Sequence, residues 1–92
     1  MSLFIAERIE RIDVNVGTSA VILAPASEDR IFLEITLAKG SAVWVTRSDS
    51  ASKEKGILLV GIGASFRVTD WLGAISAISE GTTRITGEVG YA

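Results

Sequence analysis

Apolar and polar side chains alternate with a period of two along most of this chain, and this alternation constrains its fold more than any other feature. The clearest run is RIFLEITLA over residues 30–38, where Ile31, Leu33, Ile35 and Leu37 fall on one face. Successive side chains of a β-strand point to opposite faces, whereas a helix repeats every 3.6 residues. The run therefore predicts a strand with one face in the core.

Similar runs recur along the chain, and turn residues separate them at intervals of about eight to twelve residues, which is typical of small all-β folds. Ile, Val and Thr account for 26 of the 92 residues, and these side chains favour a pleated sheet. The predicted strands are residues 12–17, 19–24, 30–38, 42–47, 57–60, 65–69, 74–79 and 82–89, and the short strand 57–60 is expected to be buried. We expect an all-β fold: a small antiparallel β-sandwich or flattened barrel of seven or eight short strands.

The N-terminal segment is the ambiguous part of the chain. Ile5, Ile9 and Ile12 have the i, i+4, i+7 spacing of a helix, with charged residues between them. The segment is therefore a short helix or an extended arm. We expect residues 1–15 to form this arm or first element, and residues 12–92 to form a single β-sandwich domain, since a chain of this length has room for one core.

Composition excludes several kinds of chemistry. The chain has no Cys and no His, which rules out disulfides, thiolate or imidazole metal sites, and Cys–His or Ser–His catalysis. Its carboxylates are scattered, with no spacing that forces two into one cleft. Gly61-Ile62-Gly63 lacks the third glycine of a dinucleotide site, because Phe66 stands at that position. We expect no enzyme activity, no cofactor and no metal.

Charge and hydropathy bear on the partners. A net charge of -2 argues against nucleic acid, which attracts a basic excess. The longest nearly uncharged stretch, residues 56–66, has about half the length of a membrane-spanning helix. Charged residues 7, 8, 10 and 11 occupy the place of an apolar signal-peptide core, which predicts no signal peptide and synthesis in a cytoplasm.

The chain is apolar for its size, with 48% hydrophobic residues and a mean hydropathy of +0.41. A small domain has much surface for its volume and cannot bury all of these side chains within itself. Some apolar surface is then expected to meet another chain. The alternative is that the many alanines inflate the mean hydropathy, and composition leaves both interpretations open.

The sequence predicts a different position for each of three aromatic side chains. In AVWVT, Val43 and Val45 lie opposite Trp44, so either the valines face the core and Trp44 lies outside, or the reverse. An outward Trp44 would be a contact residue, because tryptophan is enriched at the centres of interfaces. Trp71 is predicted to plug the core at one end of a sheet. Tyr91 is predicted to fray or to dock on a neighbouring chain.

Five strand and turn motifs follow one another along the chain, and their order is informative. They are VGTSAVILAPA (16–26), EDRIFLEI (28–35), AVWV (42–45), GILLVGIGASF (56–66) and WLGAISAISEGTTRITGEV (71–89). The ordered set resembles small tailed-bacteriophage virion proteins of the head-decoration, capsid-stabilising or head-fibre-base type. The turn before Arg30 reads Ser27-Glu28-Asp29 where that family has Pro-Asn, and the first fifteen residues lie outside the resemblance.

The resemblance implies a non-enzymatic virion structural protein on the capsid surface. Such a protein decorates and stabilises an assembled phage capsid by binding the major capsid protein and itself, often as a homotrimer. Within this interpretation, Leu3, Phe4 and Ile5 are expected to reach a neighbouring subunit. The alternative for these three residues is a first strand or turn that packs on its own domain.

A second function from a different class is a carbohydrate- or receptor-binding β-module, such as the base of a fibre. The two functions predict different surfaces. Capsid decoration predicts a flat apolar oligomer face without a pocket. Carbohydrate binding predicts a shallow groove lined by Trp44 or Trp71, with a carboxylate beside the ring.

Overall fold

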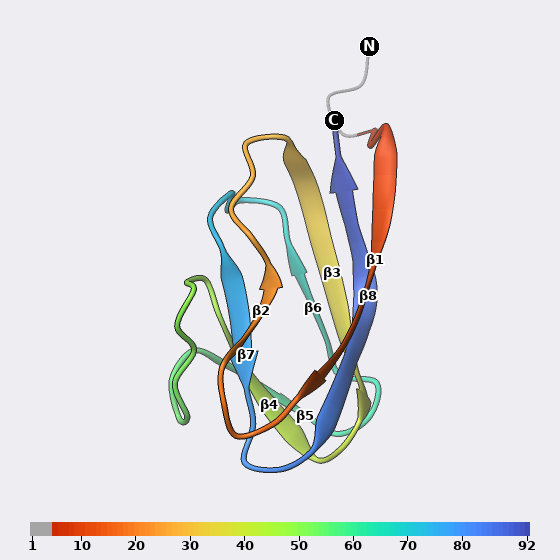
Figure 1. Ribbon diagram of the computed structural model, residues 1–92. Coiled ribbons are helices and arrows are strands. Elements are labelled where there is room, and N and C mark those ends of the chain that lie inside the picture. The colour runs from red at the N-terminus through yellow and green to blue at the C-terminus, as the bar shows by residue number, and fades with distance from the viewer. Residues whose placement is uncertain (1–4) are drawn as a thin grey trace.

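The structure is a computed structural model that describes residues 5–92, and it confirms the all-β prediction (Figure 1). Within these residues there are eight strands and no helix. The strands are β1 (Arg8–Val16), β2 (Val21–Ala24), β3 (Arg30–Lys39), β4 (Ala42–Thr46), β5 (Ile57–Val60), β6 (Ser65–Val68), β7 (Ile75–Ile78) and β8 (Thr83–Tyr91). They form two four-stranded antiparallel sheets, ordered β1-β8-β3-β6 and β2-β7-β4-β5.

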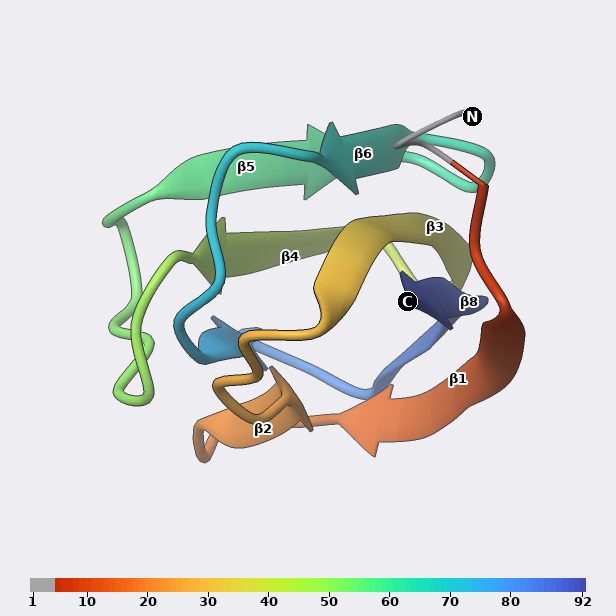
Figure 2. The same ribbon diagram turned by 90° about the horizontal axis from the view of Figure 1, so that it is seen from above.

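The two sheets form the layers of a small sandwich. Figure 2 shows β5 and β6 along one margin and β1 and β2 along the other, as the strand orders require. The core lies between the layers, where alternate residues of each strand meet. Leu33, Ile35 and Leu37 of β3 have no exposed surface, and Ile75 of β7 and Ile85 of β8 are equally buried. The period-two pattern therefore predicted the buried face correctly.

The N-terminal segment differs from the helical alternative. Residues Arg8–Val16 form strand β1, which pairs with β8 along its whole length, from Arg8 opposite Tyr91 to Val16 opposite Thr83. Ile12 faces the core, whereas Ile9 is 49% exposed, so the helical spacing of isoleucines does not mark one buried face. The hydrogen bonds between β1 and β8 stabilise the extended conformation here, although the spacing of the three isoleucines also fits a helix. β1 thus crosses the expected boundary between arm and domain.

A buried arginine fastens two loops at one end of the sandwich. Arg30 is only 4% exposed, and its guanidinium donates to the carbonyl oxygens of Pro25 (3.1 Å), Trp71 (2.8 Å) and Gly73 (2.6 Å). These acceptors belong to the β2–β3 and β6–β7 loops, so one side chain joins segments that lie far apart in sequence. Burial lowers the pKa of Arg30 from its ordinary value. The three carbonyl dipoles offset the cost of burying this charge.

Trp71 does not plug the core as predicted. Its side chain is 39% exposed and folds back on its own loop, where the indole nitrogen donates to the carbonyl of Ala74 at 3.1 Å. A Cβ at Gly73 would lie 2.6 Å from the indole ring, so glycine is needed there. The ring therefore covers the loop whose carbonyls bind Arg30.

Gly87 marks a close approach of strands β8 and β3. It lies in β8, between β1 and β3, where a Cβ would collide with the backbone carbonyl of Glu34. Because that obstacle is backbone in the neighbouring central strand, it cannot move aside without breaking the ladder. The central pair of strands therefore depends on glycine at this position.

Replacement of Arg30 by methionine should destabilise the protein by about 2–4 kcal/mol, because three carbonyl oxygens lose the buried guanidinium that donates to them. The free energy of unfolding is measured by denaturant titration. Arg11, exposed on β1, provides the matched control, and Arg11→Met should change stability by less than about 0.5 kcal/mol. Equal effects of the two substitutions would show that the buried hydrogen bonds contribute nothing.

Gly87→Ala should destabilise the sandwich by about 1–3 kcal/mol, since the added methyl group meets fixed backbone. Gly17→Ala is the control, because a Cβ at Gly17 has no atom within 4 Å. Thermal or denaturant unfolding of both variants measures the difference. A Gly87→Ala variant as stable as Gly17→Ala would contradict the close approach of β8 to β3.

Candidate functional site

The two outer faces of the sandwich differ in charge. The strands β2, β7, β4 and β5 contain no charged residue, and we call this layer the uncharged sheet. Every charged residue that lies in a strand of the described chain belongs to β1, β8, β3 or β6, which we call the charged sheet. The molecule thus presents one side suited to water and one side suited to contact.

On the charged sheet, ion pairs link side chains of neighbouring strands. Arg84 of β8 donates to both carboxylate oxygens of Asp13 on β1, at 2.8 and 2.7 Å. Arg67 of β6 pairs with Glu34 of β3, and its guanidinium also lies 4.7 Å from the centre of the Phe32 ring. These side chains are about half exposed and remain solvated, so each pair adds little stability.

On the uncharged sheet, apolar side chains in cross-strand register form a row on the outer face, next to the outward polar side chains of Thr46 and Ser76. Ile78 of β7 lies opposite Trp44 of β4, and Trp44 lies opposite Leu58 of β5. The next outward pair of β4 and β5 is Ala42 with Val60. We define the apolar face as Ile22, Ala42, Trp44, Leu58, Val60 and Ile78. Ile22, Leu58 and Val60 are 52%, 48% and 65% exposed, which is high for aliphatic side chains.

The alternation in β4 resolves the two orientations considered for Trp44. Val43 and Val45 are buried in the core, so Trp44 points outward, where it is partly buried among its neighbours. The expectation for residues 57–60 was a buried strand, and it is wrong for three of the four residues. Only Leu59 is buried. Leu58 and Val60 lie on the outer side of β5, which no second layer covers, and Ile57 lies on the inner side but is 38% exposed at the start of this edge strand.

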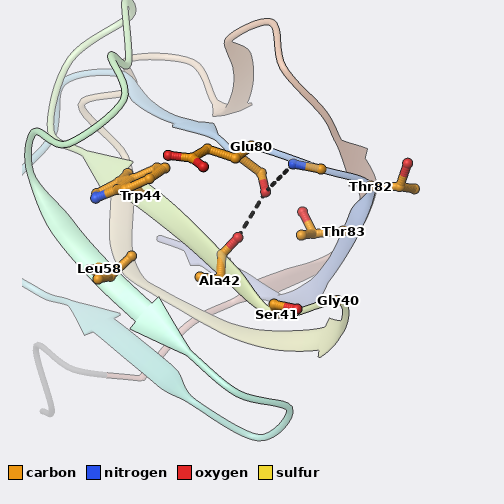
Figure 3. A pocket seen from close by; sticks show the side chains of 10 residues that line it. Gly40, Ser41, Ala42, Trp44, Leu58, Glu80, Thr82 and Thr83 are labelled. Carbon is orange, nitrogen blue, oxygen red and sulfur yellow. Dashed lines mark hydrogen bonds between the residues drawn. The ribbon is translucent and has the colours of Figure 1, made fainter.

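A shallow hollow of about 440 Å³ interrupts one end of the apolar face, beside the β3–β4 and β7–β8 turns. Figure 3 shows the Glu80 carboxylate directed toward the Trp44 ring. Ser79 holds this end together, because its hydroxyl donates to the carbonyl of Ala42 at 2.8 Å and accepts from the amide of Gly81 at 3.2 Å. The surface therefore combines the flat apolar face of one sequence hypothesis with the groove of the other.

Of the five contact residues predicted from sequence, Ile5, Trp44 and Tyr91 lie within the described residues, and the structure brings neither Ile5 nor Tyr91 to Trp44. Tyr91 is 7% exposed and packs in the chain's own core, with Arg8 stacked 4.5 Å from its ring centre, so it is not a free docking residue. It is held there because β8 extends to the end of the chain between two neighbours. Ile5 is 68% exposed, and Leu3 and Phe4 lie outside the described residues.

Most of the apolar face was not predicted from the sequence: Ile22, Leu58, Val60 and Ile78. The available signal was the absence of charge from the predicted strands 19–24, 57–60 and 74–79, a composition that also fits burial on both sides. An apolar strand in a two-layer fold has only one face to bury, so such strands must expose the other face or cover it with a partner. In a sandwich of two layers, a strand that is apolar on both faces can bury only one of them in the core, and this comparison would have identified the surface.

Other chemistry finds little support in the described residues. They contain no cluster of three side chains suited to hold a metal ion, and no helix long and apolar enough to cross a membrane. Gly61 and Gly63 have φ angles of 86° and 97° and form the turn between β5 and β6. A strand, rather than the helix of a dinucleotide site, follows this turn.

Comparison of the chain with known protein families, with curated protein sequences and with solved structures finds no match. The functional conclusion therefore depends on the surfaces described above and on the motifs of the sequence.

The hydrogen bonds from Arg84 lower the pKa of Asp13 below its ordinary value of 3.8. A carboxyl group with a lowered folded-state pKa stabilises the fold above its unfolded pKa, and this contribution disappears as pH falls through the folded pKa. Wild type should therefore be more stable than Asp13→Asn at pH 7, and the difference should shrink as pH falls below about 3.8 and vanish once pH is below the lowered folded-state pKa. Urea titrations across this range measure it, and a difference independent of pH would contradict the ion pair.

Proposed function

We propose that this chain is a non-enzymatic virion structural protein that decorates and stabilises an assembled phage capsid, by binding the major capsid protein and itself. The carrying observation is the apolar face, a row of aliphatic and aromatic side chains on a sheet without charged residues, in which Ile22, Leu58 and Val60 are exposed. A contiguous apolar surface of this kind on a small protein marks a place where another macromolecule binds. The order of the sequence motifs supports the same assignment.

The segregation of charge suits attachment to a large protein surface. Burial of the apolar face removes aliphatic groups and Trp44 from water, which favours binding at roughly 25 cal/mol per Å² of apolar area. The charged sheet then faces solvent on the outside of the shell. A protein that binds the assembled shell but not its free subunits stabilises the shell by mass action.

The side chains that line the hollow also agree with a structural role. Glu80 is the one titratable side chain among the residues that line it. Hydrolysis of a glycosidic bond ordinarily needs two carboxyl groups on opposite sides of the scissile bond. The hollow is therefore better suited to contact or binding than to catalysis.

Co-sedimentation tests the proposal, with heads purified from the phage or prophage whose genome carries this chain. The wild-type protein should pellet with intact heads in a saturable manner. Trp44→Glu places a charge in the centre of the apolar face and should reduce binding at least roughly tenfold, because the charge must lose its water. Failure of the wild-type protein to bind, or a genome without head genes, would contradict the proposal.

Thr86→Lys is the matched control for that experiment. Thr86 lies on the charged sheet opposite Asp13, so the added lysine is solvated and meets an opposite charge. This variant should bind heads as wild type does. Equal loss of binding by both variants would show that the two faces contribute alike and would exclude the apolar face as the docking site.

A second candidate function is carbohydrate binding in the hollow, favoured by the Glu80 carboxylate beside the Trp44 ring (Figure 3). An aromatic ring with a nearby polar group is the usual composition of a small-molecule site. Titration with a panel of oligosaccharides should then shift tryptophan fluorescence in wild type and in Trp71→Phe, but not in Trp44→Phe. No shift with any sugar would contradict this function.

A further inference from the structure

Strand β5 is an unprotected edge of the uncharged sheet. It is the last strand in the order β2-β7-β4-β5, and within the described residues it pairs only with β4. Its sequence, ILLV, contains no charge and no proline. Figure 2 shows it on the outer margin of the sandwich. Edge strands of this composition are a template for pairing with another chain.

The hydrogen-bond register shows which backbone groups of β5 point outward. The amide of Gly61 donates to the carbonyl of Ser41 at 2.9 Å, directly after the pair formed by Ala42 and Val60. Bonded and non-bonded pairs alternate along an antiparallel ladder. Leu59 and Ile57 therefore bond to β4, and the N–H and C=O groups of Leu58 and Val60 point away from it.

The other edges of the two sheets carry features that discourage pairing. β1 contains four charged residues, and β6 contains Arg67. β2 has an irregular register between Ile22 and Ala24, and Pro25 follows it directly. Charges, irregular pairing and proline are the usual means of blocking an edge. β5 shows none of these features, which sets it apart from the remaining edges.

We propose that β5 pairs in antiparallel orientation with β5 of a second copy of this chain, around a two-fold axis at Leu59. Leu58 of each copy then lies opposite Val60 of the other. In this register the four outward groups of each strand meet their complements, which gives four hydrogen bonds across the axis. The two uncharged sheets join into one continuous sheet of eight strands.

A second copy fits this edge better than an unrelated chain for two reasons. An antiparallel strand is complementary to itself around a two-fold axis, so the same residues satisfy both sides. The charges also fit, because the paired segment ILLV carries no charged residue, so no like charges face each other along it. Pairing places Leu58 and Val60 of both copies side by side and doubles the apolar face.

A contact of four residues per strand is small, so the pairing in solution should be weak and dependent on concentration. On an assembled shell, neighbouring copies are held close together, and this high effective concentration favours the same contact. That role rests on the capsid binding proposed above, whereas pairing in solution does not. The two proposals can therefore fail separately.

Light scattering coupled to size exclusion, over protein concentrations from micromolar to millimolar, tests the pairing. The mass should rise from one chain of 9.7 kDa toward twice that value. Val60→Pro removes only an outward N–H and leaves the ladder with β4 intact, so it should weaken the dimer roughly tenfold or more. Val60→Thr keeps that N–H and should still dimerise.

Three results would overturn the inference. They are a wild-type chain that stays monomeric at millimolar concentration, a trimer as the first species to form, and a dimer unaffected by Val60→Pro. Circular dichroism and thermal unfolding confirm that each variant is folded. If Val60→Pro does not fold, a pair of charge variants provides the test instead.

The charge variants examine the register as well as the surface. In the proposed pairing, Leu58→Lys/Val60→Asp places opposite charges across the axis, whereas Leu58→Lys/Val60→Lys places like charges there. The first variant should dimerise at least roughly tenfold more tightly than the second, and salt should reduce the difference. Equal dimerisation of both would contradict the register. Binding of these variants to heads is measured separately and reports on the capsid proposal.

Discussion

The guanidinium of Arg30 joins the two sheets at the end where their loops meet. Its three carbonyl acceptors come from the β2–β3 loop and the β6–β7 loop, and each of these loops connects the uncharged sheet with the charged one. A buried charge without such partners would cost several kcal/mol, roughly the stability of a small domain. The relative position of the layers, and hence the orientation of the apolar face, therefore depends on this side chain.

The sequence predicted the strands well because each is either an alternating run or a short apolar run bounded by turn residues. β5 was predicted with its observed bounds, and most other strands ended within one or two residues of them. β1 was obscure, because its isoleucines also fit a helix, and only pairing with β8 decides between the two. Arg30 was unpredictable for a related reason: the acceptors that make its burial tolerable come together only in the folded chain.

The candidate site was predicted in part. Trp44 was identified as a possible contact, and its outward position follows from the burial of Val43 and Val45. Leu58 and Val60 were not identified, because an uncharged strand looks the same in sequence whether one face or both are buried. Only the sheet order places β5 at an edge, with a single layer beneath it. Information of this kind is held in the topology and not in local spacing.

The apolar face and the free edge of β5 have a common origin. The strand at the margin carries Leu58 and Val60, whose side chains extend the apolar face and whose backbone groups point outward from the sheet. A partner bound only to the apolar face would leave the outward backbone groups of β5 hydrogen-bonded to water. A partner bound only to the edge would leave the side chains of the apolar face exposed. In the two proposals together, a second copy covers the edge and the capsid surface covers the face. The two contacts are therefore compatible, and each adds to the area available to the other.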